Sequence, residues 1–323
     1  MKFGEYELLE RLGAGGMGEA WLAKKGDAAP VVIKRILPQL VAQPEMLKQF
    51  LHEARVMARI HDECVAATVE LGEVRGEWFI AMEFVDGEDV QSMVERGPLS
   101  VEQVRRIGAD GAQALLAAHG ARDASGRATP VIHRDVSPHN LIFGKDGRVR
   151  LIDFGVASLT GAGESGGKYA YAAPEQLLED ETSALSDQYS LGVVLWECLS
   201  GRSAFDAEED VETIRLVTEE GVQPLPEAVP EDLRVVVMKM CALDPLDRFD
   251  DLKEVHASLS HGERVSRERG VRGATVTTAQ VERRFTVEQA NAIYGREVVE
   301  EMLTTGELRA EDLDGVRVFF KPA

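Results

Sequence analysis

The sequence predicts an α+β protein with two lobes, the first rich in strands and the second rich in helices, followed by a small C-terminal helical appendage. Near the N-terminus, apolar and polar residues alternate on both sides of a glycine cluster, which is typical of a β-hairpin. After Gly87, apolar residues recur at helical spacing in five segments. With 323 residues, 44% of them hydrophobic, the chain can bury a large core.

Residues 1–85 are expected to form the first lobe, a five-stranded antiparallel sheet with one main helix. Residues 5–36 alternate around the glycines and end in the strand-like Val31–Ile33, and residues 67–74 and 78–85 are two further strand-like runs. Residues 44–60 carry apolar side chains at helical spacing. These are Leu47, Phe50, Leu51, Ala54, Met57 and Ala58.

Residues 86–261 are expected to form the second lobe. Helices are predicted at 100–119, 186–199, 209–219, 231–241 and 250–260, with short strands at 141–143 and 149–152. Residues 262–284 hold six Arg against three Glu and show no hydrophobic period, so they are expected to form an exposed linker or arm.

Residues 285–323 regain a regular pattern. Two short helices are predicted, 286–294 capped by Thr286 and 297–305 ending at Gly306, followed by a strand at 316–320. This order is similar in outline to the small excisionase-like helix-turn-helix modules. However, the segment holds eight acidic and four basic side chains, which argues against nucleic acid. Packing on the rest of the chain, or a protein contact through Phe319 and Phe320, is the favoured expectation.

Composition excludes several classes of protein. The formal charge of −20 disfavours binding along a nucleic-acid backbone, because that binding depends on Lys and Arg. The spacing of Cys64, Cys198 and Cys241 fits neither a disulfide framework nor a zinc site. No apolar run approaches the roughly 18 residues of a membrane helix. We therefore expect a cytoplasmic protein that does not enter a membrane.

The glycine cluster at residues 13–18 reads GAGGMG, a G-x-G-x-x-G pattern whose glycines are Gly13, Gly15 and Gly18. Dinucleotide-binding folds share this pattern, but there it opens a helix, whereas Glu19–Ala23 continue as a strand toward Lys34. A glycine hairpin lets backbone N–H groups approach a triphosphate, and Lys34 supplies a charge for the phosphates. Glu53, on the inner face of the predicted helix, is the expected ion-pair partner of Lys34. Either residue by itself could be an ordinary surface side chain.

A second group of residues carries a more specific pattern. Residues 133–140 read HRDVSPHN, which matches H-R-D-x-x-x-x-N, and residues 153–155 read DFG. Phosphoryl transfer needs an acceptor hydroxyl held in line and metal ions that neutralise the phosphate oxygens. Here the chain resembles the protein kinase family. The resemblance implies that Asp135 is the catalytic base and that Asn140 and Asp153 bind magnesium.

The resemblance covers residues 5 to about 260 and is strongest to the bacterial eukaryotic-like (Hanks-type) Ser/Thr protein kinases. It implies the bilobal protein kinase fold, ATP and Mg²⁺ as cofactors, a protein substrate and autophosphorylation. Residues 173–175 read APE, and Arg248 resembles the arginine that pairs with Glu175 in the family. The family also stacks a regulatory column of side chains, at Met57, Leu71, His133 and Phe154 here. Simple core packing explains these four positions equally well.

The resemblance also implies a nucleotide pocket. Met82 corresponds to the gatekeeper, backbone groups of Glu83 and Val85 to the adenine partners, and Asp89 to a ribose contact. Ile142 is a further nucleotide-binding position. Ala20 and Val32 stand where the family usually has valine and alanine, so the two side chains are exchanged and their summed volume is kept, and we expect ordinary ATP affinity.

Two residues differ from the usual family pattern at positions that affect catalysis. Ser137 stands where most Ser/Thr kinases have a lysine that meets the γ-phosphate, and Lys168 stands where the family usually has a threonine. One hypothesis is that Lys168 supplies the missing ammonium from the opposite wall, since a well-aimed donor is worth about 2.7–4 kcal/mol in other active sites. The alternative is that Lys168 points to solvent.

Two other functions stay open, a pseudokinase that serves as a binding module or scaffold, and a regulator that uses the helix-turn-helix-like appendage. The retained Lys34, Asp135 and Asp153 count against a pseudokinase, whereas Ser137 favours it. Control by phosphorylation of the activation segment, residues 153–175, is also open, and its hydroxyls are Ser158, Thr160 and Ser165. Residues 262–323 are a candidate site for a protein partner.

Overall fold

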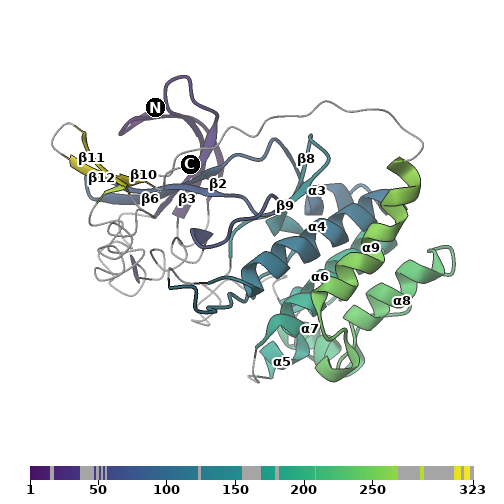
Figure 1. Cartoon of the computed structure of the whole chain (residues 1–323). Helices are drawn as coiled ribbons and strands as arrows, with labels where there is room; N and C mark the ends of the chain where they lie inside the picture. Colours follow the sequence, from purple (N-terminus) through teal and green to yellow (C-terminus); the bar gives the residue numbers. More distant parts are fainter. Residues whose placement is uncertain are drawn as a thin grey trace.

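The computed structural model describes residues 1–14, 18–36, 47–48, 51, 54, 57–122, 125–154, 169–178, 182–207, 209–267, 284–286, 309–313 and 316–320. An antiparallel sheet forms the first lobe and a group of helices forms the second, as the sequence predicts (Figure 1). A short third sheet comes from the C-terminal residues, drawn in yellow.

The first-lobe sheet has six strands rather than the five predicted. They are β1 (Lys2–Phe3), β2 (Tyr6–Ala14), β3 (Gly18–Lys24), β4 (Val31–Ile36), β5 (Thr68–Val74) and β6 (Glu77–Glu83). Their order is β1-β2-β3-β4-β6-β5, and every neighbouring pair is antiparallel. The additional strand β1 arises because the chain turns back at Gly4, whose φ is +57°. Of the helix expected at 44–60, the described residues Leu47, Lys48, Leu51, Ala54 and Met57 are helical.

The two faces of this sheet carry different side chains. One face packs into its own hydrophobic cluster, which includes Phe3, Ile33 and Phe79, and the rings of Phe3 and Phe79 meet edge to face at 5.4 Å. Successive strand residues point to opposite faces. Ala20, Val32 and Lys34 therefore lie on the face opposite to Ile33.

The second lobe begins with a small sheet and continues as helices. The sheet contains β7 (Gly87–Asp89), β8 (Leu141–Gly144) and β9 (Val149–Leu151) in that order. The helices are α3 (Val90–Val94), α4 (Val101–His119), α5 (Pro174–Leu177), α6 (Ala184–Ser200), α7 (Asp210–Arg215), α8 (Glu231–Met240) and α9 (Leu252–Arg267). None of the described helices is long and apolar enough to cross a membrane.

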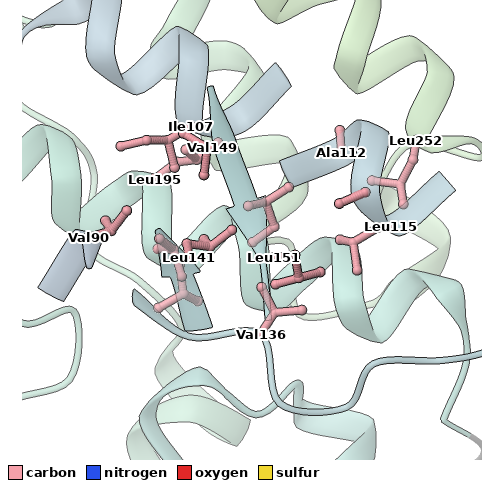
Figure 2. Close-up of a cluster of buried hydrophobic side chains, with 14 of the residues drawn as sticks. Val90, Ile107, Ala112, Leu115, Val136, Leu141, Val149, Leu151, Leu195 and Leu252 are labelled. Atoms are coloured by element: carbon pink, nitrogen blue, oxygen red, sulfur yellow. The ribbon is translucent and has the colours of Figure 1, made fainter. Parts of the chain in front are cut away.

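Helix α4 is central to the second lobe, where it packs against α6 and α9 (Figures 1 and 2). A capping box between Ser100 and Gln103 starts it. The close packing depends on glycine, because a Cβ on Gly108 would lie 2.5 Å from Leu259 Cδ1 and 2.9 Å from Leu195 Cδ1. The β8–β9 hairpin lies on the same core, which Leu141 and Leu151 enter, so the catalytic segment between α4 and β8 is held on a rigid base.

The C-terminal residues depart from the predicted pattern in two places. Helix α9 runs on to Arg267, into the range expected to be a linker. The final sheet has the order β10-β12-β11, with β10 (Arg284–Thr286), β11 (Arg309–Leu313) and β12 (Val316–Phe320). β12 occupies the range predicted as a strand, whereas β11 was not predicted. The two helices expected at 286–294 and 297–305 lie outside the described residues, apart from Thr286, which ends β10.

Candidate active site

His133 anchors the segment that carries the predicted catalytic base. Its ring is fully buried and meets the Phe154 ring at a centroid distance of 4.5 Å. Burial lowers the pKa of His133, so the imidazole is neutral near pH 7. The Asp135 N–H donates to Nδ1 at 3.2 Å, and Nε2 lies 3.1 Å from the Ile152 carbonyl. The neutral tautomer that satisfies both bonds carries its proton on Nε2.

Asp187 of α6 fixes the backbone of the same segment. Its carboxylate accepts the N–H of His133 and the N–H of Arg134, each at 2.8 Å, and lies 2.7 Å from His119 Nε2. Arg134 has a left-handed φ of +65°, which is costly for a residue other than glycine and needs support from its surroundings. Asp187 supplies that support. No role for Asp187 was predicted from the sequence, although a charged residue near the start of an otherwise apolar helix was an available signal.

Asn140 joins the two halves of the predicted site. Its Nδ2 donates to the Asp135 carbonyl at 2.8 Å and lies 3.3 Å from Asp135 Oδ2. The backbone carbonyl of Asn140 accepts the Ile152 N–H at 2.9 Å, and Asp153 is the residue that follows Ile152. Ser137 is buried, and its carbonyl accepts the Asn140 N–H at 3.0 Å. Asp135 and Asn140 are therefore in contact, and Asp153 follows directly after the residue that the Asn140 backbone binds.

Lys34 reaches the site from the first lobe. Its Nζ lies 3.3 Å from Asp153 Oδ1, although the two residues are 119 apart in sequence. Asp153 has a φ of +50°, which turns the chain sharply after β9. Glu53, the partner predicted for Lys34, lies outside the described residues. The ion pair with Asp153 places a cation beside a predicted metal ligand.

Four of the predicted nucleotide-site residues, Ala20, Val32, Lys34 and Met82, share one face of the first-lobe sheet. Ala20 pairs with Lys34 across β3 and β4, and Val32 pairs with Met82 across β4 and β6. Such cross-strand neighbours lie within about 5.5 Å of one another. Val32 lies two residues before Lys34, so it is a diagonal neighbour of Ala20, and the exchange of side-chain size concerns two positions on the same face.

Gly13 and Gly18 flank the glycine turn, while Gly15 lies outside the described residues. Gly13 lies in β2 opposite Ala20, and a Cβ there would meet nothing within 4 Å. At Gly18 a Cβ would lie 2.0 Å from the Arg35 carbonyl oxygen, so only glycine fits the close approach of β3 to β4.

The segment between the lobes restricts how adenine and ribose could bind. The Glu83 N–H donates to the Ala67 carbonyl at 2.8 Å, so an adenine contact at Glu83 would come from its carbonyl. Val85 follows β6, in the connection to β7. The Asp89 carboxylate caps α3 by accepting the N–H and the hydroxyl of Ser92 at 2.9 and 2.8 Å. Ile142 pairs with Asp89 across β7 and β8, which brings these two predicted nucleotide residues together.

A buried ion pair joins Glu175, the last residue of the predicted activation segment, to Arg248. Arg248 Nη1 and Nη2 donate to the two carboxylate oxygens of Glu175 at 2.7 and 2.9 Å, the pairing that the sequence predicts. Its remaining donors reach backbone carbonyls, at Leu185, Ala242 and Leu243. Burial alone would raise the pKa of Glu175, but the hydrogen bonds from Arg248 hold that pKa below its usual value. Lys168 and residues 155–167 lie outside the described residues.

Comparison with known proteins agrees with this geometry. The protein kinase domain model matches residues 6–259. The chain belongs to the protein kinase family. The protein kinase family uses ATP and a divalent metal ion. The four residues expected to form the regulatory column, Met57, Leu71, His133 and Phe154, are all buried.

Two curated relatives are about one-third identical to this kinase domain. Tyrosine-protein kinase MasK of Myxococcus xanthus is 34% identical over 265 residues, covering 76% of this chain and 41% of MasK. Serine/threonine-protein kinase PknH of Mycobacterium bovis is 32% identical over 304 residues, covering 86% of this chain and 49% of PknH. The chain thus spans less than half the length of either relative. The crystal structure of the Mycobacterium tuberculosis PknI kinase domain matches with a TM-score of 0.58 and 27% identity, covering 80% of this chain and 97% of that one.

Proposed function

We propose that this chain transfers the γ-phosphoryl group of Mg-ATP to serine or threonine residues of proteins, its own chain included. The observation that carries the proposal is the position of Asn140. Its side chain holds Asp135, and its backbone holds the residue that precedes Asp153. Asn140 therefore binds the candidate base, Asp135, and also the segment that carries the candidate metal ligand, Asp153.

Each residue has a defined part in the proposed reaction. Asp135 accepts the proton of the substrate hydroxyl and aligns that hydroxyl with the phosphorus. Lys34 binds phosphate oxygens. Asn140 and Asp153 would hold Mg²⁺, a cation that prefers oxygen ligands and neutralises charge on the phosphates when bound. The residues fit this ion, because the Asn140 amide nitrogen is engaged with Asp135 and its amide oxygen therefore faces elsewhere.

The test is autophosphorylation with labelled ATP and magnesium, comparing the wild type with Asp135→Asn. Incorporation that disappears in the variant supports the proposal. Incorporation that persists in the variant contradicts the role of Asp135. Phosphosite mapping by mass spectrometry decides the acceptor class, and it would also show whether Thr160 or Ser165 is phosphorylated.

The choice of serine and threonine rests on relatives. PknH, PknD and PknB carry the name serine/threonine-protein kinase, whereas MasK carries the name tyrosine-protein kinase. Ser137 and Lys168 replace the two residues from which this distinction is usually made. Mapped phosphotyrosine without phosphoserine or phosphothreonine would overturn the choice.

A pseudokinase is the competing function, and Ser137 is the observation that favours it. We propose that Lys168 supplies the charge that Ser137 lacks. Lys168→Met should then abolish phosphoryl transfer while ATP affinity, measured by calorimetry, stays unchanged. Unchanged turnover would refute the role of Lys168. A wild-type protein that binds Mg-ATP and transfers no phosphate under any condition would favour the pseudokinase.

The proposed location is the cytoplasm. All three cysteines are buried thiols without a disulfide, and burial raises the pKa of each, which suits a reducing compartment that contains ATP. Recovery of the protein in the membrane fraction of cells would contradict it. For the appendage we propose protein contacts rather than DNA binding, because β10 lies against β5 of the first lobe. A gel shift on DNA at physiological salt would contradict that proposal.

A further inference from the structure

A pocket of about 660 Å³ opens where the C-terminal end of α4 meets α9 and residues 59–62 of the first lobe. Helices α4 and α9 run side by side along this part of the second lobe (Figure 1). The volume lies within the range of about 300–1,000 Å³ that is usual for small-molecule sites. Of the predicted catalytic and nucleotide-binding residues that the structure describes, none lines the pocket.

The lining of this pocket is cationic, although the chain as a whole carries a charge of −20. Its basic residues are Arg59, His61, Arg122, Lys253 and His256. Among the described lining residues the one carboxylate is that of Asp62, and it already accepts hydrogen bonds from protein donors. Asp62 Oδ1 accepts the Cys64 N–H at 2.9 Å, and Oδ2 accepts Gln113 Nε2 at 2.8 Å.

The cations of this pocket are incompletely neutralised. Arg59 is half-buried and makes no ion pair or hydrogen bond with any residue that the structure describes. Arg122 donates Nη1 to the Gly126 carbonyl, a neutral acceptor. Lys253 pairs with Asp251 at 3.2 Å, but the Lys253 side chain is 76% exposed, so this pair is weak. A partly desolvated guanidinium without an acceptor favours binding of an anion.

We propose that this pocket binds a phosphate monoester. Guanidinium groups bind phosphate oxygens in pairs, and Arg59 and Arg122 line the pocket from two segments that are far apart in the sequence. The pocket is larger than a phosphate ion, and its apolar wall of Leu116, Ala117 and Ala121 offers a surface for the organic part of the ester.

Two sources could supply this group, a free phosphate ester or a phosphothreonine of this chain. Thr275 lies eight residues beyond Arg267, the end of α9, so an extended chain could carry it up to about 27 Å. His256 in the pocket lies eleven helical residues before Arg267, or about 16 Å. The chain beyond α9 is therefore long enough to return to the pocket. This second source rests on the proposed kinase activity, whereas the pocket itself does not.

The experiment uses the full chain with Asp135→Asn, so that it does not depend on phosphorylation by the protein itself. Calorimetry would measure binding of a peptide of residues 270–280 phosphorylated at Thr275, the same peptide without phosphate, and O-phosphothreonine. Saturating Mg-ADP keeps these ligands from the nucleotide site. We expect the phosphopeptide to bind and the unphosphorylated peptide not to bind.

Variants connect the binding to the pocket. Arg59→Gln should weaken phosphopeptide affinity by about tenfold or more, because a hydrogen bond to a charged group is lost. The double variant Arg122→Gln/Lys253→Gln should weaken phosphopeptide affinity by a similar factor. Both residues are exposed, so we expect this variant to fold normally. Arg96→Gln, an exposed arginine paired with Glu88, is the matched control and should change nothing.

The outcomes separate the sources and the competing explanations. Affinity for the phosphopeptide well above that for O-phosphothreonine assigns the site to the chain beyond α9, and equal affinities assign it to free esters. Equal binding of the two peptides, or equal affinity in all variants, would overturn the proposal. Because the protein in this experiment lacks Asp135, a negative result leaves the proposed kinase activity untouched.

Discussion

The ion pair between Glu175 and Arg248 provides a test of how the second lobe is stabilised. The Arg248 side chain is fully buried and that of Glu175 is 8% exposed. All five guanidinium N–H groups have acceptors, two on the carboxylate and three on backbone carbonyls. Glu175→Gln keeps the shape of the side chain but removes the only charge that compensates this buried cation within the hydrogen-bonded group.

We expect Glu175→Gln to lower the free energy of unfolding by about 3–5 kcal/mol, the cost of a buried charge that has lost its partner. For a domain of this size the same loss lowers Tm by roughly 6–20 °C. Arg248→Met should cost a similar amount. The double variant should cost at least about 2 kcal/mol less than the sum, because no uncompensated charge remains.

The assay is denaturant unfolding followed by the fluorescence of Trp196, which is buried in α6. Trp21→Phe and Trp78→Phe remove the other two tryptophans, so the signal reports on the second lobe. Asp232→Asn is the control, since Asp232 is 64% exposed in its pair with Arg105 and should contribute less than about 1 kcal/mol. A loss below about 1 kcal/mol in Glu175→Gln, or strict additivity in the double variant, would contradict a stabilising role for this buried ion pair.

The same pair gives a pH dependence with a defined sign. The pKa of Glu175 is lower in the folded protein than its usual value, so the folded state favours the ionised carboxylate. The stability that this provides is complete above the unfolded pKa of about 4.3 and is lost as pH falls through the folded pKa. The stability difference between wild type and Glu175→Gln should therefore be constant from about pH 6 to 8 and should shrink in acid. A difference that grows in acid would contradict the assignment.

Three further predictions follow from other contacts. Asp187→Asn should lower kcat about 100-fold in steady-state assays, because an amide cannot accept both backbone N–H groups of the catalytic segment. Gly108→Val should cost about 1–3 kcal/mol in thermal unfolding, because its Cβ would lie 2.5 Å from Leu259 Cδ1. Tyr171→Phe should cost about 1–3 kcal/mol, because it removes the O–H that donates to the buried Glu197 at 2.7 Å.

Each of these three predictions has a result that would contradict it. A wild-type kcat in Asp187→Asn would contradict the proposed role of the Asp187 carboxylate in holding the backbone of the catalytic segment. A Gly108→Val protein that unfolds at the wild-type temperature would mean that α4 and α9 can separate at no cost. Tyr169→Phe, at an exposed tyrosine, is the control for Tyr171→Phe, and equal effects of the two would contradict the role of the bond to Glu197.

Short elements were the hardest to predict from the sequence. β1 has two residues, too few to show an alternating pattern, and it forms only because Gly4 turns the chain back. β11 contains Glu311 and Asp312, which are unfavourable in strands, and it is held by pairing with β12. The extension of α9 to Arg267 has no hydrophobic period to reveal it.

The two-lobed architecture and the residue types of the candidate site could be predicted from the sequence, because hydrophobic periods and closely spaced motifs are local properties of the chain. Asp135 and Asn140 are five residues apart, so their pairing follows from one short segment. Contacts between distant groups could not be predicted in this way. The contact between Lys34 and Asp153, the hold of Asp187 on the catalytic backbone and the cationic pocket all join segments that the sequence keeps apart, and their positions depend on how helices and sheet pack.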